Sequence, residues 1–229
     1  MTRPHIKICG LKTEGHIDTV LARGCSEVGF VHFERSPRHL SIEDMIRLRA
    51  HVGGRALVTV VTVDADDDFL KRLGARVHPD VIQLHGSETA ARVAAVQALT
   101  GATVMKAIPV ASVADLEEIE RFRPVADRIL LDARAPKTSN IPGGNGVSFD
   151  WGLLDALETR DFTLSGGINP DTIEAAVRRV APRGLDVSSG VEREPGVKDD
   201  GLIHRLFDAF EAAVEAGPLT HHEEKRRFA

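Results

Sequence analysis

Two side chains that can exchange protons stand at the ends of short apolar segments. Cys9 ends HIKIC (5–9) and is followed by Gly10, and Asp132 ends DRILLD (127–132). A thiolate can act as a base or a nucleophile, and a partly desolvated carboxyl group can keep its proton near neutral pH and act as an acid. The alternatives are a small buried side chain for Cys9 and a helix cap or loop hydrogen bond for Asp132.

Two segments rich in glycine and serine follow later apolar runs. They are SGGIN (165–169) and DVSSGVE (186–192), and neither contains a basic residue. Glycine lets backbone N–H groups approach a ligand closely, and helix N-termini favour anions. One such loop is explained by a tight turn that needs glycine, but two together favour a phosphate site. Its candidate ligands are Gly166, Gly167, Ser188, Ser189 and Gly190.

Arg38 lies in the segment SPRHLS (36–41), where Ser36-Pro37 indicates a turn. A guanidinium group can bind a carboxylate through two parallel hydrogen bonds. A solvated surface arginine is the alternative. An acid, a base, an arginine for a carboxylate and a pair of phosphate loops together suit the isomerisation of a phosphorylated sugar, which defines a reaction class but not a substrate.

Eight short apolar runs alternate with amphipathic stretches along the 229 residues. Several runs are apolar nearly throughout, which is typical of strands buried on both faces of a parallel sheet. Helix-start signals precede four of the amphipathic stretches, at Thr13, Ser41, Ser87 and Asn169-Pro170. The alternation of eight strands with eight helices predicts a closed (β/α)8 barrel with parallel strands. A doubly wound open sheet is the alternative, but no GxGxxG follows the first run. The predicted strands are residues 5–9, 26–31, 56–63, 80–84, 103–108, 127–132, 161–165 and 184–188.

Barrels of this kind build their active sites at the carboxyl ends of the strands. The prediction therefore brings Cys9, Arg38, Asp132 and the two phosphate loops to one rim. Cys25 begins the second strand at the opposite rim, which fits a buried small side chain and argues against a disulfide with Cys9. No linker divides the chain, so we expect one catalytic barrel over residues 1–216 and a polar tail over residues 217–229.

Composition excludes several functional classes. The formal net charge of −5, with no basic block, argues against nucleic acid as a partner. No apolar run reaches about 18 residues, no signal peptide is visible and two cysteines form no disulfide framework, so we expect a cytoplasmic protein without a membrane partner. The ten histidines form no HExxH pattern, and His221 and His222 lie in the polar tail, so we expect no metal site.

Nine short motifs, in their order along the chain, resemble the phosphoribosylanthranilate isomerase family of tryptophan biosynthesis. Each motif is weak alone, but the set is specific and spans nearly the whole predicted barrel. The motifs are KICG (7–10), SPR (36–38), QLHG (83–86), LLD (130–132), GGNG (143–146), FDW (149–151), LSGG (164–167), DVSSGVE (186–192) and PGVKD (195–199).

The resemblance implies an Amadori rearrangement of N-(5-phosphoribosyl)anthranilate to 1-(2-carboxyphenylamino)-1-deoxyribulose 5-phosphate. It implies Cys9 as general base, Asp132 as general acid and Arg38 at the anthranilate carboxylate. Asp186 matches an aspartate at the substrate, and the glycine- and serine-rich loops match the phosphate site. No metal or organic cofactor is implied, because the substrate nitrogen serves as the electron sink, and no oligomer is required. The sequence departs from the family at Asn145, where Thr or Ser is usual, and in the long stretch before it.

Three competing interpretations remain at this point. A related barrel isomerase of histidine biosynthesis performs the same chemistry but typically carries aspartate where this chain has Cys9. A Schiff-base aldolase needs a lysine inside the barrel, for which Lys106 is the candidate. A barrel that binds phosphoribosyl groups without catalysis would lack the acid or the base, and both are present.

Overall fold

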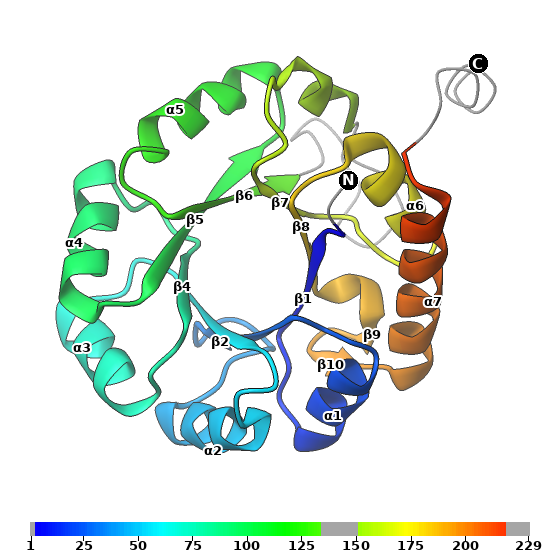
Figure 1. Ribbon diagram of the computed structural model, residues 1–229. Helices are drawn as coiled ribbons and strands as arrows, with labels where there is room; N and C mark the ends of the chain where they lie inside the picture. The colour runs from blue at the N-terminus through cyan, green and yellow to red at the C-terminus, as the bar shows by residue number, and fades with distance from the viewer. Residues whose placement is uncertain (1–2, 134–150, 219–229) are drawn as a thin grey trace.

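Eight parallel strands close into a barrel, and helices surround it (Figure 1). The structure is a computed structural model that describes residues 3–133 and 151–218. Each strand pairs with the next along the chain, and β8 pairs with β1 to complete the ring. The predicted closed barrel is therefore confirmed, and the open sheet is excluded. The strands are β1 (His5–Cys9), β2 (Glu27–His32), β3 (Leu57–Thr62), β4 (Val81–Leu84), β5 (Thr103–Val110), β6 (Arg128–Ala133), β7 (Thr163–Ser165) and β8 (Gly184–Val187).

The connections between strands are helical, although not all are regular α-helices. The α-helices are α1 (Glu14–Ala22), α2 (Ile42–Val52), α3 (Asp67–Arg76), α4 (Ala90–Thr100), α5 (Glu118–Phe122), α6 (Ile173–Ala175) and α7 (Asp200–Ala216). Short 3-10 segments are η1 (Val113–Glu117), η2 (Trp151–Ala156) and η4 (Ser189–Val191), and η3 (Ala176–Val180) is a π-helical turn. After β8 the chain also forms a small hairpin of β9 (Glu192–Glu194) and β10 (Val197–Lys198).

Helix caps follow the sequence in three cases and correct it in one. Thr13 and Ser41 cap α1 and α2 as expected, each accepting a hydrogen bond from a backbone N–H. The predicted cap Ser87 is wrong, because Thr89 accepts the capping hydrogen bond from the Arg92 N–H at 3.2 Å. The predicted start at Asn169-Pro170 is confirmed, because Asn169 Oδ1 accepts from the Thr172 N–H at 3.1 Å and the Asn169 carbonyl accepts from the Ile173 N–H at 3.0 Å, although the regular α-helix begins only at Ile173.

Two parts of the sequence-based interpretation lie outside the described residues. The first is the GGNG motif with Asn145, together with the stretch that precedes it. The second is the tail from residue 219 onward, although α7 ends at Ala216, where the predicted barrel ends. Of the sixth connection, the described part contains η2, a 3-10 segment where a helix was expected.

Side chains along each strand alternate between the barrel interior and the helices outside it. The outward residues form one large apolar core with the helices. Inside, a small apolar cluster lies low in the barrel, and a second cluster of Cys9, Val31 and Val61 lies nearer the rim. The lower cluster consists of Val81, Met105, Ala107 and Leu130.

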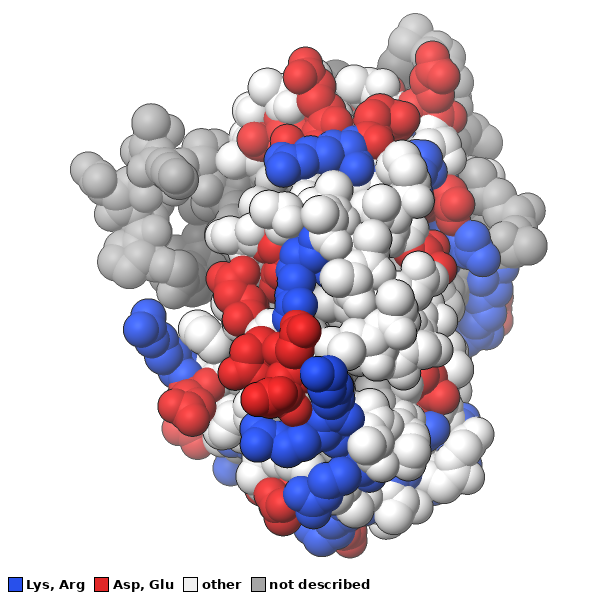
Figure 2. All heavy atoms as spheres, turned by 90° about the vertical axis from the view of Figure 1, so that its left-hand side faces the viewer, with Lys and Arg blue, Asp and Glu red and all other residues white. Residues whose placement is uncertain are grey.

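The outer surface carries charges of both signs. On the side covered by α3 and α4, lysine and arginine lie next to aspartate and glutamate, with uncharged surface between them (Figure 2). Among the described residues, no helix is long and apolar enough to cross a membrane.

Candidate active site

The predicted acid and base lie at the same rim of the barrel. Cys9 is the last residue of β1, and Asp132 is the last but one of β6, which continues one residue further than expected. In the strand register Asp132 lies beside Ser165 of β7, and Ser165 lies beside Asp186 of β8. Asp132 and Asp186 thus occupy neighbouring positions at the carboxyl ends of nearby strands, where active sites of this fold form.

Cys9 is a buried thiol whose neighbouring strand leaves room for it. Its partner in the register is Gly29 of β2, where a Cβ atom would lie 2.8 Å from the Cys9 sulfur. Burial raises the pKa of the Cys9 thiol, and the charge of Asp186 raises it further, whereas the charges of Lys7 and Lys198 lower it. The two lysines therefore make the thiolate more accessible than burial alone would allow.

Cys25 is the contrasting thiol. It is buried just before β2, and its sulfur donates to the backbone carbonyl of Glu27 at 3.1 Å. Burial raises the pKa of Cys25 to about 12. Both cysteines are free, as expected, and Cys25 is a packing residue.

Lys7 is a charged side chain inside the barrel that the sequence analysis passed over. It is 1% exposed, and its Nζ donates to Asp186 Oδ1 at 2.8 Å and to Gln83 Oε1 at 3.0 Å. Burial alone would lower the pKa of Lys7, but the Asp186 carboxylate raises it above its usual range. Asp186, one of the predicted substrate residues, is therefore fixed in place by a buried ion pair.

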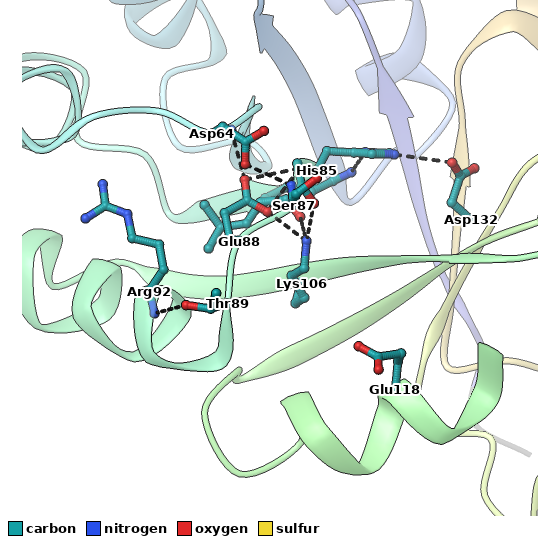
Figure 3. Close-up of polar contacts among 12 residues, drawn as sticks. Asp64, His85, Ser87, Glu88, Thr89, Arg92, Lys106, Glu118 and Asp132 are labelled. Carbon is teal, nitrogen blue, oxygen red and sulfur yellow. Dashed lines mark hydrogen bonds and ion pairs between the residues drawn. The ribbon is translucent and has the colours of Figure 1, made fainter. Parts of the chain in front are cut away.

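His85 connects Asp132 to the same interior network. Its Nε2 lies 3.2 Å from Asp132 Oδ2, and its Nδ1 lies 3.1 Å from Gln83 Nε2 (Figure 3). The Asp132 side chain is 18% exposed, so the carboxyl group is partly desolvated and still accessible. The sequence signal for this network was present, because Lys7 and Gln83 are polar residues within otherwise apolar strands.

Arg38 is held by a glutamate that the sequence analysis did not single out. Its Nε and Nη2 donate to the two carboxylate oxygens of Glu192, at 2.7 and 2.5 Å. Glu192 also accepts from Lys198 Nζ at 2.8 Å and from the Gly196 N–H at 3.1 Å. Burial raises the pKa of Glu192, but these donors outweigh it and lower the pKa to about 2. Gly10 has a φ of 79°, a backbone angle that lets the chain turn here. A Cβ atom at this position would lie 2.5 Å from Arg38 Cδ, so the absence of a side chain also lets Arg38 approach.

The two predicted phosphate loops are in direct contact. A Cβ atom at Gly190 would overlap the backbone carbonyl oxygen of Ile168, so the loop after β8 packs against the loop after β7 only because residue 190 is glycine. Gly166 and Gly167 have positive φ angles of 92° and 70°. Among the residues that the structure describes, none lies within 4 Å of a Cβ built at Gly167, so this part of the structure leaves open space beside it.

The helical segments after the two loops differ in length. After β7, α6 continues directly into η3, so the helical segment runs from Ile173 to Val180, whereas η4 after β8 has three residues. The dipole contribution predicted for both loops is therefore supported by a longer helical segment only after β7, and the loop after β8 offers its backbone N–H groups. Lys198 also approaches this region, because its buried Nζ donates to the Ser188 carbonyl at 2.9 Å.

Metal ligands are not grouped in the described part of the chain. There, no three His, Cys, Asp or Glu side chains are arranged to hold a metal ion. The chemistry available at this rim is therefore that of a thiol, carboxyl groups, an imidazole and backbone donors.

Comparison with known proteins gives a consistent result. The family model described as N-(5'phosphoribosyl)anthranilate (PRA) isomerase matches residues 6–209. The N-(5'-phosphoribosyl)anthranilate isomerase of Agrobacterium fabrum is 50% identical over 207 residues, which cover 90% of this chain and 94% of that protein. The crystal structure of phosphoribosyl anthranilate isomerase from Thermotoga maritima has a TM-score of 0.81 and 31% identity, covering 91% of this chain and 99% of that chain.

A further solved structure holds a ligand. It is phosphoribosyl anthranilate isomerase in complex with reduced 1-(O-carboxyphenylamino)-1-deoxyribulose 5-phosphate, with a TM-score of 0.78 and 29% identity. The match covers 91% of this chain and 99% of that chain.

The fold and the site define an isomerase of the (β/α)8-barrel class. The relatives narrow this class to one family, because the match extends over nine tenths of the chain. The chain belongs to the N-(5'-phosphoribosyl)anthranilate isomerase family. The predicted family, barrel fold and isomerase function in tryptophan biosynthesis are thereby confirmed, whereas the roles of individual residues stay predictions.

Proposed function

We propose that this chain converts N-(5-phosphoribosyl)anthranilate to 1-(2-carboxyphenylamino)-1-deoxyribulose 5-phosphate with Asp132 as general acid and Cys9 as general base. The observation that carries the assignment is the position of both side chains at the carboxyl rim, one accessible carboxyl group and one buried thiol flanked by lysines. The cytoplasmic location, the absence of nucleic-acid partners and a function without an oligomer stay predictions.

The reaction follows from the two protonation states. Asp132 donates its proton to the furanose ring oxygen, the bond from that oxygen to C1′ breaks, and the substrate nitrogen takes up the positive charge as an iminium ion. That charge acidifies the C2′ proton, which the Cys9 thiolate removes. The resulting enolamine tautomerises to the ketone. Each proton transfer by a positioned side chain contributes about 10²–10⁴-fold to the rate.

The remaining site residues bind the substrate. Glu192 engages Nε and Nη2 of Arg38, and we assign the anthranilate carboxylate to Nη1, the third nitrogen of the guanidinium group. Asp186, oriented by Lys7, contacts the sugar. The phosphate lies in the open space beside Gly167, against backbone N–H groups of Gly166, Gly167, Ser188, Ser189 and Gly190.

The aldolase alternative fails on the position of Lys106. Met105 and Ala107, its neighbours on β5, point into the barrel, so Lys106 points outward. There its Nζ donates to Glu88 Oε2 at 2.7 Å and lies 5.6 Å from the centre of the Phe122 ring. A lysine that pairs with a glutamate outside the barrel wall cannot attack a carbonyl group inside it.

The test is kinetic, with complementation of a tryptophan auxotroph that lacks this step. Asp132→Asn should lower kcat by at least about 100-fold because an amide cannot deliver the proton. Cys9→Ser should also lower kcat strongly, while Cys25→Ser, the matched control, should stay near wild type. Retention of more than about a tenth of kcat by Asp132→Asn would assign the acid elsewhere, and equal losses from both cysteine variants would reduce the Cys9 effect to packing.

A further inference from the structure

Four polar side chains form a continuous chain across the barrel mouth, from β1 through β4 to β6. Lys7 contacts Gln83 at 3.0 Å, Gln83 contacts His85 at 3.1 Å, and His85 contacts Asp132 at 3.2 Å. The direction of each hydrogen bond in this chain can be deduced from one end. A lysine ammonium group has three donors and no acceptor.

The orientation of the Gln83 amide follows from Lys7. Because Lys7 only donates, the atom of Gln83 that faces it must be the carbonyl oxygen Oε1. The Asp186 carboxylate on the other side of Lys7 raises the pKa of the lysine and keeps it charged. The NH₂ group of Gln83 is therefore directed at His85, and the usual ambiguity between the two ends of an amide does not arise.

The tautomer of His85 follows from Gln83 in the same way. A donor directed at Nδ1 requires Nδ1 to accept, so the single proton of the neutral imidazole lies on Nε2. That Nε2–H group is directed at Asp132 Oδ2. The opposite tautomer would leave two donors facing each other at Nδ1 and two acceptors at Nε2 whenever Asp132 is ionised.

The loop that carries His85 is clamped from outside the barrel wall. Lys106 Nζ donates to the Gly86 carbonyl at 2.8 Å, and the Gly86 N–H donates to Glu88 at 3.0 Å (Figure 3). The Lys106 and Glu88 side chains are only 4% and 3% exposed and pair with each other. The peptide groups next to His85 are thus fixed, which helps to hold the imidazole with Nδ1 facing Gln83 and Nε2 facing Asp132.

We propose that Lys7 and Gln83 are positioning residues that hold His85 as the Nε2–H tautomer, so that His85 donates to Oδ2 of Asp132 and the proton delivered to the substrate is carried by Oδ1. This inference rests on the proposed function, in which Asp132 is the acid. When Oδ1 releases its proton to the ring oxygen, the carboxyl group becomes an anion. The hydrogen bond from His85 then becomes charge-assisted and stabilises that anion.

The first experiment measures the wild-type protein. The ring nitrogens of His85 are observed by ¹⁵N NMR on labelled wild-type enzyme at pH 7, with His85→Asn used only to identify the signals. We expect a protonated Nε2 and an unprotonated Nδ1. A protonated Nδ1 overturns the proposal whatever the activity of any variant.

The second experiment reverses the polarity at one position. Gln83→Glu places a carboxylate where the NH₂ donor was, which turns Nδ1 into a donor, so the His85 signal should move to a protonated Nδ1. Gln83→Met removes the donor without adding an acceptor. Losing this hydrogen bond should lower kcat about tenfold while KM changes less than about threefold. An unchanged His85 spectrum in Gln83→Glu, or a loss in Gln83→Met confined to KM, contradicts the proposal.

Gln97→Met is the matched control for Gln83→Met. Gln97 also donates through its amide, to Asp127 at 2.9 Å, but it lies exposed on α4 away from the rim. Its kcat and KM should stay within about twofold of wild type. The proposal and the function can fail separately. An active Asp132→Asn variant would refute the assignment of Asp132 as the acid without affecting the tautomer of His85. A protonated Nδ1 would refute the tautomer without affecting the assignment of the acid.

Discussion

Replacing Glu192 should destabilise the folded protein in a way that depends on pH. Glu192 is 3% exposed and accepts hydrogen bonds from Arg38, Lys198 and the backbone of Gly196. In Glu192→Gln the two cations keep their burial and lose their counter-charge. Breaking a buried ion pair from one side is costly because it leaves charge without compensation.

The magnitude follows from the pKa. Burial raises the pKa of Glu192, but Arg38 and Lys198 lower it from 4.5 to about 2. That difference corresponds to about 3 kcal/mol of the free energy of unfolding at neutral pH. Because the pKa is lower in the folded state, this stabilisation is complete above about pH 4.5 and is lost as the pH falls towards 2, so that only about 1.4 kcal/mol remains at pH 3.

The measurement is urea unfolding of wild type and Glu192→Gln at pH 7 and at pH 3. We expect the difference in the free energy of unfolding to shrink by roughly 2 kcal/mol between the two pH values. Glu194→Gln, on the same hairpin but 64% exposed, is the matched control and should differ from wild type by less than about 0.5 kcal/mol. A Glu192→Gln effect of the same size at both pH values would refute the electrostatic reasoning.

Three further predictions concern the substrate and the base. Arg38→Ala should raise KM roughly tenfold to a hundredfold, since a charge-assisted pair contributes about 1.5–3 kcal/mol. The effect should be smaller for an analogue that lacks the anthranilate carboxylate. Equal losses for both compounds would limit Arg38 to shaping the loop. Gly167→Val should raise KM and weaken inhibition by inorganic phosphate in parallel, because a valine is strained at φ of 70° and fills the open space. Arg193 is 64% exposed, and Arg193→Ala should change KM and phosphate inhibition by less than about threefold. A larger effect of Arg193→Ala than of Gly167→Val would assign the phosphate to side-chain cations. Burial and Asp186 raise the pKa of Cys9 more than Lys7 and Lys198 lower it, so the thiolate is the minor form at neutral pH. The value of kcat/KM should therefore rise between pH 6 and pH 8. A flat profile would argue against a thiolate base.

The strands and their order could be predicted because each is a short apolar run, and two-sided burial leaves that pattern in the sequence itself. Helix starts were harder. Ser87 and Thr89 both carry a hydroxyl group ahead of α4, and what decides between them is distant: the Ser87 N–H donates to Asp64 Oδ1 at 2.8 Å. A local signal cannot include a partner 23 residues away.

The residues of the candidate site show the same contrast between local signals and distant partners. The positions of Cys9 and Asp132 at the rim could be predicted, because the carboxyl ends of all eight strands of this fold meet at one rim. Their supporting residues were not found, because Lys7 pairs with Asp186 across 179 positions and Arg38 with Glu192 across 154. A buried lysine in an apolar strand does, however, require a partner, and that requirement was available from the sequence.

The ion-paired groups near Cys9 do not balance in charge. Lys7, Lys198 and Arg38 are three cations, linked to two anions, Asp186 and Glu192. One surplus positive charge is therefore shared at the rim, and it favours the Cys9 thiolate. Under the proposed function, the carboxylate of the substrate binds Arg38 and draws on the same charge. Substrate binding and proton release from Cys9 would then oppose each other by the same free energy, so the proposed base would have its highest proton affinity once the substrate has bound.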